Sequence, residues 1–192
     1  MSTTKPSTGN TLPQSYYMRR FYDNNKKAFT ASSRKTIGTT ELTQKDISAL
    51  HKAVKKLQNF NYDKEVAKDE LGNSSITNAI QAYVDIYNNT MESGSKATDP
   101  EIKRYMKQLQ KYTNDHKEEL AKMGIDINRD HTLKAKKSMI LSVNPSKIKD
   151  AFSKENGYLK SIQRIARRFE SKSTQLLYSE LTGNGNVVNT TI

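Results

Sequence analysis

The sequence contains no cysteine and no tryptophan. Without cysteine the chain has no disulfide, no thiolate metal ligand and no cysteine nucleophile, and its redox compartment is left open. No apolar run approaches the roughly 20 residues that a membrane span needs, and the first ten residues lack the apolar core of a Sec-type signal peptide. Hydrophobic residues make up 34% of the chain and the mean hydropathy is -0.85, which indicates helices with mostly polar surfaces, or disordered tails.

Motifs that carry catalysis are missing as well. There is no glycine-rich phosphate loop, no G-x-S-x-G elbow and no H-E-x-x-H metal motif. His51, His116 and His131 fall in different predicted elements, and none has a visible carboxylate or serine partner. Adjacent acids such as Glu118 and Glu119 face different directions on a helix, which indicates a charged helix surface. We therefore predict a protein that is not an enzyme and has no cofactor, no metal and no small-molecule substrate.

The length of 192 residues suits one domain with loose ends. Residues 1–14 are rich in serine, threonine and proline and are expected to form a disordered tail. A basic aromatic segment follows over residues 15–40. Residues 41–182 are predicted to form a helical bundle with a hairpin insert, and residues 183–192 a disordered C-terminal tail.

Positive charge dominates, and much of it lies near the N-terminus. The formal net charge is +12, from 32 Lys and Arg against 20 Asp and Glu. Residues 1–60 hold eleven of these cations and three acids, so +8 of the charge lies there. One interpretation is an anionic partner, which would be nucleic acid, a membrane surface or an acidic protein; the other is an ordinary solvated surface.

Residues 15–40 interleave aromatic rings with cations. The rings could stack on bases while the cations meet phosphates. They could equally dock a short helix, residues 15–29, on the body of the protein, and the lack of a recognisable nucleic-acid module favours docking. If a polyanion binds, the expected contacts are Arg19, Arg20, Lys26, Lys27, Arg34, Lys35, Arg164, Arg167 and Arg168.

Apolar residues recur at spacings of three and four in four stretches, which predicts four amphipathic helices. They cover about residues 43–60, 74–91, 99–123 and 158–181. Thr43 is the expected N-cap of the first helix, and Gly124 is expected to end the third.

Between the third and fourth helices the periodicity changes. Alternating apolar residues predict a small β-hairpin at about residues 125–135. Asn144 as cap and Pro145 as first helical residue then predict a short helix that ends at Phe152.

The predicted fold is therefore mainly α: an elongated antiparallel helical bundle with coiled-coil-like seams and one small β-hairpin. Each helix offers only a narrow apolar stripe, so the monomer is expected to gain stability by association. The candidate protein interface consists of seam residues: Leu109, His116, Leu120, Ile162, Phe169 and Leu176. His116 is polar at a seam position, where it would set register or partner choice; a boundary histidine with satisfied hydrogen bonds is the other interpretation.

Five features follow one another in order between about residues 76 and 180. They are the helix pattern AYVDIYN (82–88), the helix end LAKMGI (120–125), the hairpin end DHTL (130–133), the short helix NPSKIKDAF (144–152) and Gly157 before the last helix. Their order and spacing resemble the C-terminal region of the flagellar filament cap protein family, also called flagellar hook-associated protein 2. Two differences stand out: the chain is far shorter than cap proteins, and His131 stands where the family has a glycine in the turn.

The resemblance implies a non-enzymatic structural or assembly protein of a flagellum. Its partners would be further copies of itself or another flagellar component, bound through helices. Its location would be extracellular, by flagellar rather than Sec export, or otherwise cytoplasmic. The alternative function is a polyanion-binding module, with nucleic acid as the partner of the basic aromatic segment.

Overall fold

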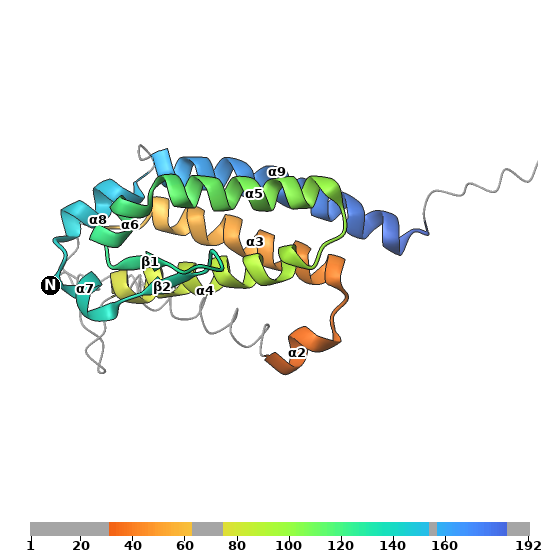
Figure 1. Ribbon diagram of the computed structural model, residues 1–192, viewed down its shortest axis with the longest axis horizontal. Helices are drawn as coiled ribbons and strands as arrows, with labels where there is room; N and C mark the ends of the chain where they lie inside the picture. The colour runs from red at the N-terminus through yellow and green to blue at the C-terminus, as the bar shows by residue number, and fades with distance from the viewer. Residues whose placement is uncertain (1–30, 63–74, 154–156, 184–192) are drawn as a thin grey trace, which may run out of the picture.

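Four long helices form the body of the protein and lie side by side (Figure 1). They are α3 (Thr39–Gln58), α4 (Ser75–Ser95), α5 (Pro100–Asp115) and α9 (Gly157–Leu181). The computed structural model describes residues 31–62, 75–153 and 157–183. Each of the four helices runs antiparallel to the one before it, so the predicted mainly α fold, an elongated antiparallel bundle, is confirmed.

Shorter elements complete the described part of the chain. They are α2 (Ala31–Thr36), α6 (Lys117–Lys122), β1 (Ile125–Ile127), β2 (Leu133–Ala135), α7 (Lys137–Ser142) and α8 (Pro145–Phe152). The predicted tails, apart from Gly183, and the basic aromatic segment up to residue 30 lie outside the described residues.

Helix α3 lies at the centre of the bundle, because it packs against both α4 and α9. The seam predicted for it is buried, with exposures of 1% or less: Ile47, Leu50, Val54 and Leu57. The helix starts at Thr39 with Gly38 as N-cap, so the expected cap at Thr43 is wrong. Thr43 instead lies in the second turn and is buried next to Leu42, which extends the apolar face toward the N-terminus.

Two further helices differ from the prediction at their ends. α4 continues to Ser95, beyond its predicted end at about residue 91, because its last turns are buried and packing overrides local helix propensity. The helix predicted over residues 99–123 divides into α5 and α6 at His116, whose backbone leaves the helical conformation with φ -107 and ψ 19.

The hairpin forms where it was predicted, with Ile127 of β1 paired to Leu133 of β2. Its turn places His131 in the left-handed region, with φ 64, a conformation that glycine adopts more readily. Asp130 stabilises the turn, since its carboxylate accepts hydrogen bonds from the backbone N–H and the hydroxyl of Thr132 at 3.1 and 2.6 Å.

Asn88 of α4 attaches the hairpin to the bundle. Its side-chain Nδ2 donates to the carbonyl oxygen of Leu133 at 2.8 Å, and its Oδ1 accepts from the Leu133 N–H at 2.7 Å. The carboxamide thus pairs with β2 as a neighbouring strand would. Asn88 therefore fixes the position of β2 on α4.

Gly124 and α8 follow the prediction, whereas α7 (Lys137–Ser142) was not predicted. Gly124 ends the preceding helix with φ 80, and a Cβ at this position would lie only 2.9 Å from the Cβ of Met139. Asn144 caps α8 by accepting from the Ser146 N–H at 2.9 Å, and Phe152 is fully buried.

A pair of hydroxyl contacts lies inside the core, where α4 meets α9 and α5. The Tyr83 and Tyr158 hydroxyls are hydrogen-bonded at 2.5 Å, and their rings meet edge to face at 89°. The Tyr87 hydroxyl donates to the Thr113 Oγ1 at 3.1 Å. Burial raises the pKa of Tyr87 to about 12 and holds the pKa of Tyr83 and of Tyr158 above the usual tyrosine range.

These raised pKa values predict unfolding in alkali. The unfolded chain ionises its tyrosines near a pKa of about 10, whereas the folded chain keeps these three neutral. Their contribution to stability is therefore full below pH about 10 and is lost as the pH rises through the pKa values of the folded protein. We expect the free energy of unfolding to fall by about 4 kcal/mol per pH unit above that point, from three groups. Tyrosinate absorbance and helical circular dichroism, followed together, should show these tyrosines ionising only as helix is lost; ionisation of all ten tyrosines in a fully helical chain would contradict this.

Candidate functional site

The six residues predicted as a protein interface do not form an exposed surface. Leu109, Leu120, Ile162 and Phe169 are buried in the core of the chain itself. His116 is half-buried beside Tyr158 and donates from Nδ1 to the carbonyl oxygen of Tyr112 at 2.9 Å, as expected of a boundary histidine. Leu176 is partly exposed at the edge of the core.

The C-terminal end of α9 carries the most exposed large apolar residues of the described chain. α9 extends beyond the neighbouring ends of α3 and α5 (Figure 1). Tyr178 is 69% and Leu181 77% exposed, and Leu177 is partly exposed. Leu181 lies four residues after Leu177 and three after Tyr178, so it neighbours both on the helix surface, and these three residues are here called the α9 end stripe.

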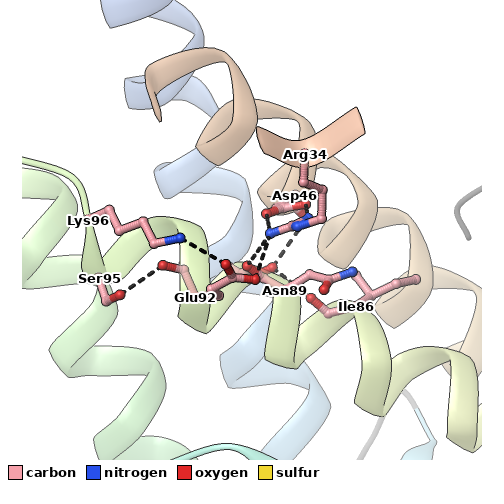
Figure 2. Close-up of polar contacts among 8 residues, drawn as sticks. Arg34, Asp46, Ile86, Asn89, Glu92, Ser95 and Lys96 are labelled. Carbon is pink, nitrogen blue, oxygen red and sulfur yellow. Dashed lines mark hydrogen bonds and ion pairs between the residues drawn. The ribbon is translucent and has the colours of Figure 1, made fainter. Parts of the chain in front are cut away.

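Arg34, a predicted polyanion contact, is engaged inside the protein (Figure 2). Its Nη1 and Nη2 donate to the two carboxylate oxygens of Asp46 at 2.9 and 3.0 Å, and the two side chains are only 9% and 1% exposed. Nη2 also contacts Glu92 and the carbonyl oxygen of Asn89 on α4. The guanidinium therefore joins α2 to α3 and α4 and is not available to an external anion.

The other predicted cations are divided between different places. Arg19, Arg20, Lys26 and Lys27 lie outside the described residues, and Lys35 is exposed on α2. Of the arginine cluster on α9, Arg164 and Arg167 line a groove against α3, whereas Arg168 is exposed and does not line it.

This groove, here called the α3/α9 groove, is a hollow of about 450 Å³. It is lined by His51 and Lys55 of α3 and by Gly157, Lys160, Ser161, Gln163, Arg164 and Arg167 of α9. Lys160, Arg164 and Arg167 are separated by four and three residues and therefore share one face of α9. The structure thus adds His51, Lys55 and Lys160 to the predicted arginines, although these lysines had no distinctive local sequence signal.

His51 has a carboxylate partner that the sequence did not reveal. Its Nδ1 lies 2.5 Å from Glu170 Oε2, and the His51 side chain is 14% exposed. The two residues are 119 positions apart, so only the packing of α3 on α9 brings them together. This contact fixes the His51 ring at the edge of the groove.

A second hollow, of about 420 Å³, lies where the start of α3, the α4–α5 loop and the end of α9 meet. Hydroxyl groups line it, and the Thr40 hydroxyl donates to Glu180 at 2.5 Å across it. Among the described residues no group of three or more His, Asp and Glu side chains is placed to hold a metal ion. None of the described helices is both long and apolar enough to cross a membrane.

Comparisons with models of protein families, with curated proteins and with solved structures found no match. The resemblance to the filament cap family therefore stays a prediction from the sequence.

The Arg34–Asp46 pair predicts a local stability test. Arg34→Gln leaves the buried Asp46 carboxylate without its cation, and we expect the free energy of unfolding to fall by about 3 kcal/mol. Lys35→Gln is the matched control, because Lys35 is the exposed neighbour on the same helix, and it should change stability by less than about 0.5 kcal/mol. Urea unfolding measures both; equal midpoints for the two variants would show that the ion pair does not hold α2 in place.

Proposed function

We propose that this chain is a non-enzymatic assembly protein that associates through helices, of the kind that the inner helical region of a flagellar filament cap represents. The observation that carries the proposal is the α9 end stripe, which leaves Tyr178 and Leu181 in water at the end of a long helix. Side chains of this size gain about 1.5 to 3 kcal/mol each when they are buried. A helix end of this kind is typical of helix-mediated association.

The proposed partner is a second copy of the chain. Residues 174–183 contain one charged residue, Glu180, which is hydrogen-bonded to Thr40 within the chain. Two such ends can approach each other with little local repulsion even though each chain carries +12. A symmetric dimer uses the same patch on both copies, so a self-complementary apolar stripe is sufficient.

The flagellar setting is the further part of the proposal, and it rests on the order of sequence features between residues 76 and 180. In that setting the protein would leave the cell by the flagellar export route, and the alternative location is the cytoplasm. The arrangement of α4, the hairpin, α8 and α9 along the chain is compatible with that order of features.

The α9 end stripe can be tested by mass. Light scattering of the full chain should give a defined oligomer that persists at high salt, because apolar burial is not screened. Tyr178→Ser with Leu181→Ser removes two apolar side chains and should weaken association roughly 100-fold, equivalent to about 3 kcal/mol.

The matched control for this test uses the other exposed large apolar residues of the described chain, Met139 and Leu141 on α7, which are 40% and 46% exposed. Met139→Ser with Leu141→Ser should leave the mass unchanged. A wild-type monomer at every concentration, or loss of the oligomer in the control, would contradict the assignment of the interface to α9.

A further inference from the structure

We propose that the α3/α9 groove binds a small polyphosphate anion, such as the triphosphate group that inorganic tripolyphosphate and nucleoside triphosphates share. This site lies apart from the α9 end stripe and does not depend on the association proposed above. The proposed association uses the α9 end stripe only, so it gives no role to the basic side chains of the α3/α9 groove.

The charge of the groove is the first argument. Lys55, Lys160, Arg164 and Arg167 are all exposed, and within the described part of the chain none of them forms an ion pair with a carboxylate. Some other described cations do, and one of them is Lys45, which pairs with Glu41 on the surface of α3. Four cations held around one hollow repel one another, and an anion of high charge removes that repulsion.

The positions of these groups are the second argument. Lys160, Arg164 and Arg167 come from successive turns of α9, about 5.4 Å apart along the axis, and Lys55 faces them from α3. Adjacent phosphates of a linear polyphosphate are closer together than one helical turn, so these long, flexible side chains would converge on the phosphate chain from several turns. Arginine is suited to this role because its planar guanidinium contacts two phosphate oxygens at once.

The rest of the lining argues for phosphates rather than bases. No phenylalanine or tyrosine ring lines the groove, and its one imidazole, His51, is held against Glu170, so the groove lacks the series of rings on which single-stranded nucleic acid stacks. Ser161 and Gln163 add neutral hydrogen-bond donors. The volume of about 450 Å³ is that of a small-molecule site, whereas a nucleic-acid strand requires an extended basic track.

The test is calorimetric titration of the full chain with inorganic tripolyphosphate, which should bind at low salt and bind less well as salt is raised. Arg164→Gln with Arg167→Gln should weaken binding about 100-fold, because each charge-assisted contact contributes about tenfold. Arg168→Gln is the matched control: it removes an exposed arginine of the same helix that does not line the groove, and it should change the affinity by less than about twofold.

Two further ligands distinguish the sources of the anion. Equal affinity for ATP and tripolyphosphate would show that the groove recognises the phosphate chain alone. Tighter binding of ATP would show that the groove recognises a nucleotide. The proposal is overturned if tripolyphosphate does not bind at low salt, if the double variant binds as the wild type does, or if only a single-stranded oligonucleotide binds. The double variant should keep the helical signal and the mass of the wild type, so failure here is separable from failure of the α9 interface.

Discussion

The hydrogen bond between the Tyr83 and Tyr158 hydroxyls constrains how the helices of the bundle are aligned. Apolar stripes such as that of α3 specify which faces meet, but they tolerate repacking and discriminate poorly between neighbouring registers. A buried hydroxyl discriminates well, because a shift of α9 by one turn, about 5.4 Å, would take the Tyr158 hydroxyl out of reach of Tyr83. An unsatisfied buried hydroxyl costs about 1 to 3 kcal/mol. The hydrogen bond between Tyr87 of α4 and Thr113 of α5 constrains the alignment of α5 in the same way.

The alignment of α4, α5 and α9 in turn determines which surfaces are left for partners. Leu109, Ile162 and Phe169 are 0% exposed, so these positions of the predicted seams are buried within the chain itself. What projects is the end of α9, beyond the length of its neighbours (Figure 1). The alignment of the helices likewise places the basic side chains of the groove, since Lys55 and Arg164 line the same hollow only because α3 packs against that part of α9.

The features that could be predicted from the sequence are those with local causes. α8 has its cap and its proline within three residues, α9 has an unbroken stripe, and the hairpin has period-two alternation next to a glycine with positive φ. The features that could not be predicted have distant causes. Asn88 of α4 bonds to β2, 45 residues away, and a sequence gives no local sign of such a partner.

For the α3/α9 groove, too, the sequence identified some residues, and others became apparent only from the packing of the helices. A cation cluster on α9 was visible as Arg164, Arg167 and Arg168, but its members differ in space: two face the groove and one does not. Arg34 belonged to a basic segment by composition, yet Asp46 and Glu92 surround it in the fold. Whether a cation is available to an anion depends on the acids that packing brings near it, and for that reason composition alone included Arg34 and missed Lys55 and Lys160.

The two proposed surfaces lie on one helix, and their separation decides whether they influence each other. From Arg167 to Leu181 α9 advances fourteen residues, which corresponds to about 21 Å at a rise of about 1.5 Å per residue. That distance exceeds two Debye lengths at physiological salt, where the screening length is about 8 Å. An anion in the α3/α9 groove therefore changes the potential at the α9 end stripe very little. At low ionic strength, where the screening length reaches about 30 Å, the same anion would lower the repulsion between two chains of charge +12 and so favour their association.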